Sequence, residues 1–275
     1  CAEGGTGPQH SQVGLRGKSP WGPFTPFAGN PILTQCELPA GPANPITNAG
    51  HADIVQAPDG SWWSVFLATR TYDRDHYNTG RETFLLPVTW TNGWPIILDN
   101  GRTIPYVAPG PKFMAKRSDA SPTTGNFTWR DEFDRRALDL AWLHARVPKS
   151  EWTDLRSRPG TLTIHPLAAT LDTLGNPSFL GRRQQHLAFD SSLAFTPPSE
   201  RGVAAGMAAF QNENHWYFLG TRRVGSELQV FLDKRGGKET KTIATTKLTP
   251  APSLRLRITG DPRNYSFYYD ADGRG

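Results

Sequence analysis

The sequence predicts an all-β protein made of two successive β domains, and three observations support this fold class. Gly and Pro are abundant, with 27 and 24 among 275 residues, above their combined share of roughly 12% in average proteins. They are spread along the chain, as is typical of short strands joined by tight turns. Short alternating polar and apolar stretches recur from end to end. Only residues 137–142 predict a short helix.

Hairpin-like units with Gly and aromatic punctuation predict β-propeller blades in residues 1–108. Turn signals, Pro-Asp-Gly in one unit and Asn-Gly in another, separate the paired strands. The predicted strands of these units are residues 11–16, 51–56, 62–67, 82–90 and 94–97.

A stretch rich in Pro, Gly, Ser and Thr, residues 109–126, predicts a linker. Beyond it, residues 127–275 predict a β-sandwich, because regular short strands alternate with polar turns. The chain stops just after a predicted strand, so we expect this second domain to be truncated. The predicted strands are residues 161–165, 185–195, 203–210, 215–222, 227–233, 242–248, 253–258 and 265–269.

Charge and apolar patterning exclude several classes of partner. The formal net charge is +5, but the basic residues are scattered and form no run that would follow phosphates, so we expect no nucleic-acid binding. No apolar stretch approaches the roughly 20 residues that a membrane helix needs, so we expect no membrane partner. Cys1 and Cys36 match no zinc pattern and are expected to be free thiols, although a disulfide stays open.

Carboxylate chemistry cannot be located from spacing alone. Hydrolysis by paired carboxyl groups needs one carboxylic acid to protonate the leaving oxygen, while a second carboxylate activates water or attacks directly. The acid must stay protonated near neutral pH, so its pKa has to be raised by its surroundings. The sequence holds 25 Asp and Glu residues, most of them expected on the surface.

Ordered motifs in the first domain supply the missing assignment. Residues 1–7 contain Ala-Glu-Gly-Gly-Thr, and Gly-His-Ala-Asp and Gly-Arg-Glu-Thr follow at residues 50–53 and 80–83. In this order the motifs resemble those of glycoside hydrolase family 43, the β-xylosidases and α-L-arabinofuranosidases. The resemblance implies the C-terminal blades of a five-bladed β-propeller, followed by a concanavalin-like or jelly-roll β-sandwich.

The resemblance implies roles for three residues. Glu3 is expected to be the general acid, His51 to lie beneath the sugar on the propeller axis, and Arg81 to bind substrate and pair with the carboxylates. His51 is also expected to help hold a structural Ca²⁺ through water, and no other cofactor is implied. From the residues alone, Glu3 reads as a terminal carboxylate, His51 as a structural residue and Arg81 as a surface partner of Glu82.

The same resemblance places the catalytic base, an Asp, upstream of Glu3 in family order. We therefore expect the 275-residue chain to be a fragment open at both ends, and inactive alone. Its parent is expected to be an inverting exo-glycosidase acting on xylo-oligosaccharides or arabinoxylan-type carbohydrate.

Two alternative functions stay open. The chain could be a non-catalytic carbohydrate-binding module or scaffold, or an exo-hydrolase with another family 43 specificity. The preference between β-1,4-xylose and α-L-arabinofuranose is also open, as are the oligomeric state and the cellular location.

Overall fold

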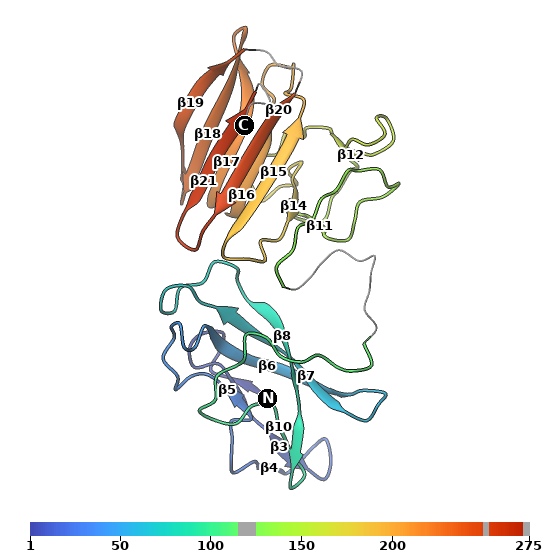
Figure 1. Ribbon diagram of the computed structural model, residues 1–275, viewed down its shortest axis with the longest axis vertical. Coiled ribbons are helices and arrows are strands. Elements are labelled where there is room, and N and C mark those ends of the chain that lie inside the picture. The colour runs from blue at the N-terminus through green and yellow to red at the C-terminus, as the bar shows by residue number, and fades with distance from the viewer. Residues whose placement is uncertain (115–124, 250–252, 272–275) are drawn as a thin grey trace. The chain divides into compact units, whose positions relative to one another are not determined.

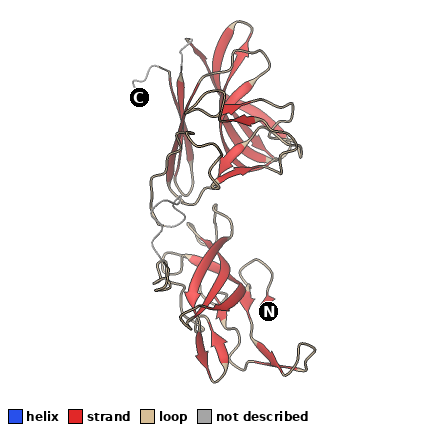
Figure 2. Cartoon of the chain, turned by 90° about the vertical axis from the view of Figure 1, so that its right-hand side faces the viewer, coloured by secondary structure: helices blue, strands red, loops and turns tan. Residues whose placement is uncertain are grey.

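The computed structural model describes residues 1–114, 125–249 and 253–271, and all regular structure within them is β-strand (Figures 1 and 2). The all-β prediction is therefore confirmed. The chain divides into two compact units, Cys1–Ser118 and Asp119–Gly275. Residues 115–124 of the predicted linker lie outside the described residues, so the bounds 109–126 stay a prediction. Within the described ranges, no helix is long and apolar enough to cross a membrane.

Residues 1–114 form ten strands in four small antiparallel sheets. The sheets have the strand orders β1–β2–β5, β3–β4, β6–β7–β8 and β9–β10. The strands are β1 (Ala2–Glu3), β2 (Ser11–Gln12), β3 (Leu15–Gly17), β4 (Phe24–Pro26), β5 (Leu33–Thr34), β6 (Ile46–Gln56), β7 (Trp62–Arg70), β8 (Glu82–Pro87), β9 (Thr89–Thr91) and β10 (Trp94–Ile96).

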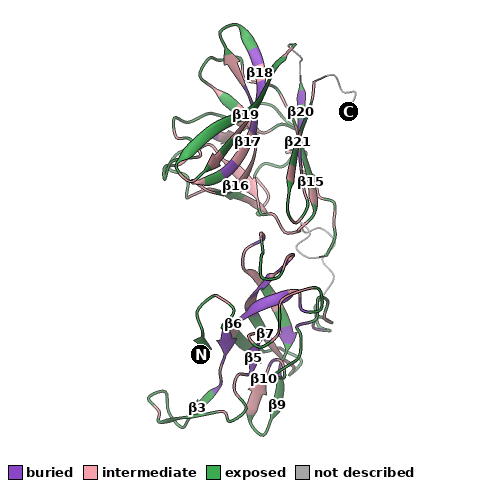
Figure 3. Ribbon diagram, turned by 90° about the vertical axis from the view of Figure 1, so that its left-hand side faces the viewer, coloured by how far each residue is buried: buried purple, intermediate pink, exposed green. Residues whose placement is uncertain are grey.

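The two long strands β6 and β7 carry the core of the first unit (Figure 3). Ile46 of β6 and Phe66 of β7 are almost fully buried, and Leu33 of β5 packs into the same cluster. Burying an Ile, Phe or Leu side chain contributes about 1.5–3 kcal/mol relative to exposure. Because Leu33 and Ile46 lie in one buried cluster, the sheet β1–β2–β5 packs against β6. This packing determines which side chains of β2 face β6.

Residues 125–271 form eleven strands in four further antiparallel sheets. The sheets have the orders β11–β14, β12–β13, β15–β20–β21 and β16–β17–β18–β19. The strands are β11 (Trp142–His144), β12 (Thr153–Asp154), β13 (Thr163–Ile164), β14 (Leu180–Arg182), β15 (Phe189–Phe195), β16 (Ala204–Asn212), β17 (His215–Val224), β18 (Glu227–Gly236), β19 (Glu239–Leu248), β20 (Leu254–Gly260) and β21 (Tyr265–Asp270).

The two largest sheets of this unit pack face to face, as Figure 1 shows. Leu219 and Val230 from the four-stranded sheet meet Leu254 and Leu256 from the three-stranded sheet in one buried cluster. Along β20, apolar buried residues alternate with exposed arginines, the period of two expected of a strand with one covered face. The sandwich prediction is confirmed.

The predicted helix at residues 137–142 is wrong. The segment is a turn that leads into β11. A carboxylate oxygen of Asp139 accepts the backbone N–H of Ala141 at 2.8 Å, and the Asp139 carbonyl accepts the N–H of Trp142 at 3.0 Å. Side chains of Asp that bind nearby backbone N–H groups favour turns over helix interiors. The turn positions the Trp142 indole to donate to Asp131 at 2.8 Å.

Both cysteines are free. Cys1 is exposed and Cys36 is partly buried, as the sequence predicts.

Candidate active site

His51 lies on β6 where the strand departs from regular pairing. Its side chain is exposed, and its backbone has φ 54°, in the left-handed region. Between Gly50 and Asp53 the register of the β6–β7 ladder shifts, so that two residues of β6 oppose one residue of β7. This is a β-bulge, a feature that re-aims side chains and is common next to active sites. The bulge therefore determines the direction of the His51 ring.

Arg81 has an unusual environment for a charged side chain. It is half-buried, and its Nε and Nη2 atoms are buried without a hydrogen-bond partner among the described residues. A buried donor that lacks a partner destabilises a protein by about 1–3 kcal/mol, and more when the group is charged. A guanidinium in this state is a ready receptor for a carboxylate or a hydroxyl group, because its fork of N–H groups matches both.

The neighbouring carboxylate does not supply that partner. Glu82 accepts two hydrogen bonds from Arg70, at 2.8 and 2.7 Å, and a third from the Thr79 hydroxyl at 2.8 Å. The hydrogen bonds that Arg70 donates to Glu82 raise the pKa of the Arg70 guanidinium above its ordinary value. The pairing follows from the β7–β8 register, in which Glu82 lies opposite Ala68, close to the end of β7. The alternative of a surface ion pair between Arg81 and Glu82 is therefore wrong.

Glu3 lies on the short strand β1, and its side chain is exposed. It pairs with Ser11 of β2, so the side chains of Glu3 and Ser11 project from the same face of the sheet. Both line an open cavity of about 420 Å³. The other residues that line it are Gly4, Gln9, Val13, Asn30, Pro31 and Cys36. Neither His51 nor Arg81 borders this cavity.

The opposite face of the same sheet looks toward β6. Gln12, the neighbour of Ser11, accepts the N–H of Ala52 at 2.9 Å, and His10 bonds the carbonyl of Asn48 at 3.0 Å. Side chains on adjacent strand residues point to opposite faces, so Glu3 and Gln12 project from opposite faces of this sheet, while the backbone of β1 lies close to β6.

His10 and Gln12 are contacts of this region that the sequence reasoning missed. The period of two along a strand could have indicated them. Residues 10 and 12 lie on one face of the strand, and Ser11, which pairs with Glu3, lies on the other.

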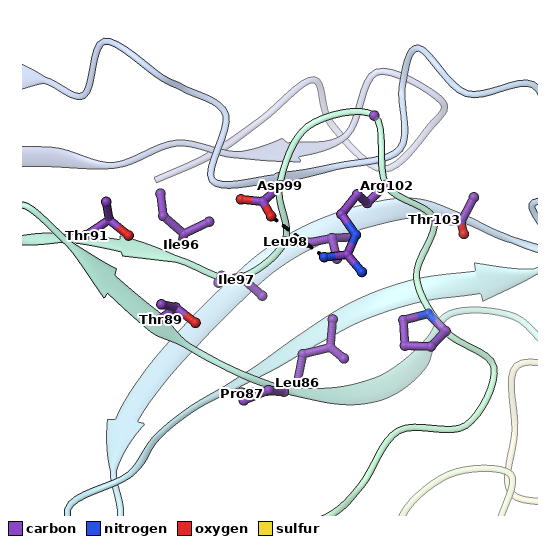
Figure 4. A pocket seen from close by; sticks show the side chains of 12 residues that line it. Leu86, Pro87, Thr89, Thr91, Ile96, Ile97, Leu98, Asp99, Arg102 and Thr103 are labelled. Carbon is purple, nitrogen blue, oxygen red and sulfur yellow. Dashed lines mark ion pairs between the residues drawn. The ribbon is translucent and has the colours of Figure 1, made fainter.

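A larger groove of about 860 Å³ lies along β8, β9 and the segment after β10 (Figure 4). Leu86, Ile96 and Ile97 line its wall, and Asp99 forms an ion pair with Arg102 at 3.8 Å near the loop at its edge. Both members of that pair are more than two-thirds exposed, so their attraction contributes little. None of the three predicted site residues lines this groove.

A Ca²⁺ site near His51 would need several oxygen donors. Calcium takes six to eight oxygen ligands, whereas His51 offers only ring nitrogens. Within the described residues no group of three or more His, Cys, Asp or Glu side chains could hold a metal ion. The described side chains therefore form no Ca²⁺ site by themselves.

The sandwich carries several aromatic rings on the outer face of its four-stranded sheet, but they are covered. Phe218 and Phe231 contact each other at 5.4 Å between ring centres, and Phe231 is 1% exposed. Trp216, on the same face by register, is 7% exposed. Phe179, which precedes β14, packs on Phe210 at this face. Buried rings cannot stack on a sugar, so Phe231 and Trp216 are core residues.

Comparison with known proteins identifies the family. A model described as glycosyl hydrolases family 43 matches residues 1–95, and one described as β-xylosidase C-terminal concanavalin A-like domain matches residues 130–275. The chain belongs to glycosyl hydrolase family 43. The fold class predicted from the motifs, propeller blades followed by a concanavalin-like sandwich, is thereby confirmed.

Family 43 relatives agree over both units. A non-reducing end α-L-arabinofuranosidase of Bacteroides ovatus is 35% identical over 97% of this chain and 49% of its own length. A β-xylosidase of Bacillus subtilis is 27% identical over 98% of this chain and 49% of its own. The crystal structure of a GH43_12 protein from a capybara gut metagenome has a TM-score of 0.88 and 30% identity, covering 100% of this chain and 51% of that one. The chain spans about half the length of the curated relatives it matches.

Proposed function

We propose that the protein is an O-glycosyl hydrolase that removes terminal β-1,4-xylose, α-L-arabinofuranose, or both, from plant polysaccharide fragments with inversion of the anomeric centre. Membership of family 43 supports the reaction class, and the names of two relatives, an α-L-arabinofuranosidase and a β-xylosidase, support the two sugars. Within the chain itself, the observation that carries the proposal is the half-buried Arg81 guanidinium, whose Nε and Nη2 lack a partner among the described residues.

Arg81 would act by binding anions and hydroxyl groups. A guanidinium beside a carboxyl group favours the ionised form, which is the form that a catalytic base needs. The remaining N–H groups of the fork would donate to a sugar hydroxyl. Glu82 is already held by Arg70 and Thr79, so it does not compete for Arg81. His51, aimed by its bulge, would contact the sugar from β6.

We propose that Glu3, whose side chain is exposed on β1, is the general acid that protonates the leaving oxygen. The family order places the base upstream of Glu3, so we propose that the 275-residue chain alone does not hydrolyse glycosides.

The experiment uses the protein with its upstream sequence, assayed on p-nitrophenyl β-xyloside and p-nitrophenyl α-L-arabinofuranoside. The Arg81→Lys variant keeps the positive charge but loses the planar fork of guanidinium N–H donors. We expect it to lower kcat/KM by about 10²- to 10³-fold, as loss of an aligned donor does at other sites. Arg102→Lys, on the exposed loop by the larger groove, is the matched control and should retain activity. If both variants keep full activity, the proposed role of Arg81 is wrong.

Glu3→Gln in the same protein tests the acid separately. Loss of activity on glycosides with poor leaving groups, with less loss on activated aryl glycosides, is expected of a general acid. Unchanged rates on both would show that the acid lies elsewhere. A protein that cleaves neither sugar but binds xylan would favour the binding-module alternative.

A further inference from the structure

Strand β6 contains two bulges three residues apart. Against β7, Thr47 pairs with Thr69, Gly50 with Leu67 and Asp53 with Val65. Each interval therefore has two residues on β6 opposite one on β7. The first residue of each bulge has its backbone in the left-handed region, with φ 56° at Asn48 and φ 54° at His51. Glycine usually occupies this position, so a His there requires support from its surroundings.

The support comes from side chains of the β2 segment. The ring Nδ1 of His10, which immediately precedes β2, lies 3.0 Å from the carbonyl oxygen of Asn48 in the first bulge. The Oε1 atom of Gln12 accepts the N–H of Ala52 in the second bulge at 2.9 Å. Bulge residues leave ladder groups unpaired, and buried backbone groups need partners. His10 and Gln12 supply one partner to each bulge.

Both supporting side chains are buried, at 2% exposure for His10 and 8% for Gln12. Because the carbonyl of Asn48 can only accept, His10 must carry its proton on Nδ1. The His10 ring also lies against the backbone of Gly50, where an added Cβ would come within 2.6 Å of Nε2. Gly50 therefore lets the ring approach the segment between the two bulges.

The first bulge is also held by a hydrogen bond to a side chain of β7. The side-chain amide of Asn48 donates to the Thr69 hydroxyl at 2.8 Å, and Thr69 is fully buried. Asn48 is thus held from both sides, whereas Gln12 bonds the backbone N–H of Ala52, the residue that follows His51. Gln12 is the more direct of the two supports for the direction of the His51 ring.

We propose that His10 and Gln12 are positioning residues, which hold the two bulges of β6 and thereby fix the direction of the His51 side chain. The inference rests on the proposed function for the role of His51, but the support of the bulges stands on geometry alone. Neither residue is expected to touch substrate. Their removal should misplace His51 while leaving its chemistry intact.

The test uses two matched pairs of substitutions. Gln12→Glu keeps an acceptor for the Ala52 N–H, and Gln12→Met keeps the length without an acceptor. His10→Asn keeps a donor near the position of Nδ1, and His10→Leu removes it. His76→Asn replaces an exposed histidine elsewhere in the first unit. It controls for the effect of removing any histidine. Thermal unfolding of each variant establishes that it folds.

The first readout is the nuclear magnetic resonance signal of the His51 ring Cε1–H in this 275-residue chain, assigned through His51→Gln. Gln12→Met and His10→Leu are expected to shift or split the signal, while Gln12→Glu, His10→Asn and His76→Asn leave it in place. An unmoved signal in folded Gln12→Met and His10→Leu variants would overturn the proposal. This readout needs no catalytic activity, so it stands even if the proposed function fails.

The second readout is steady-state kinetics in the protein with its upstream sequence. A displacement of a binding group by about 1 Å can lower the rate by about 10²-fold. We expect Gln12→Met to lose about that factor in kcat/KM and Gln12→Glu to restore most of it. Equal kinetics for the two variants, together with a shifted His51 signal in Gln12→Met, would show that His51 is positioned by Gln12 but does not serve catalysis.

Discussion

Replacing Arg81 by Met should stabilise the first unit, which is the reverse of what removing a half-buried arginine usually does. The guanidinium Nε and Nη2 are buried without a partner among the described residues. Each unpaired buried donor costs about 1–3 kcal/mol. Met keeps the apolar contacts of the arginine stem and removes both donors. After allowing for solvent at the rest of this half-buried group, we expect a gain of about 1–2 kcal/mol in the free energy of unfolding.

Arg70→Met is the matched control, because the two arginines differ in their partners. Arg70 forms two short hydrogen bonds with Glu82, and both side chains are largely buried, at 14% and 22% exposure. Its removal leaves Glu82 without its cation and should cost about 2–3 kcal/mol. The two substitutions therefore have opposite expected signs, although they differ by only eleven positions in sequence.

The assay is urea denaturation of the 275-residue chain. Tryptophan fluorescence monitors the unfolding transition of the first unit. A gain of 1 kcal/mol raises the urea midpoint by about 0.3–1 M, because ΔG falls by about 1–3 kcal/mol per M urea. If Arg81→Met destabilises the unit as much as Arg70→Met, Arg81 has a partner in solution and the reasoning is refuted. Stabilisation combined with loss of activity in the longer protein would be the trade-off expected of a residue kept for function.

Three further predictions follow from the packing. Gly50→Ala should lower the free energy of unfolding by about 1–3 kcal/mol, measured in urea, because its Cβ would meet the His10 ring; an unchanged midpoint would contradict the contact. Leu256→Ala should cost about 2–5 kcal/mol in the sandwich transition, since Leu256 is fully buried between the two sheets. Hydrogen bonds from Arg257 lower the pKa of Asp190, so their stabilising effect is present above the unfolded value of about 3.9 and is lost as pH falls through the lower folded value. Asp190→Asn should therefore differ from the parent at pH 7 and converge with it in acid; a constant difference down to the lowest pH would contradict this linkage.

The strands were predictable because their signal is local. Leu254, Leu256 and Ile258 alternate with Arg255 and Arg257, and the structure buries the first three in the sandwich. The segment at residues 137–142 failed for an equally local reason: the Asp139 side chain competes for backbone N–H groups that a helix would need.

The motifs in the sequence indicated the family, and the recurring short alternating stretches indicated the all-β class. The roles of His51 and Arg81 stay predictions. Tertiary structure decided how these residues are held. Sequence proximity suggested that Glu82 pairs with Arg81, but strand pairing assigned it to Arg70. Glu3 of the first motif projects from the face of its sheet opposite Gln12, and the buried side chains of His10 and Gln12 contact β6. The physical reason is that a motif specifies residue types along the chain, whereas register and bulges decide which face of a strand each side chain occupies.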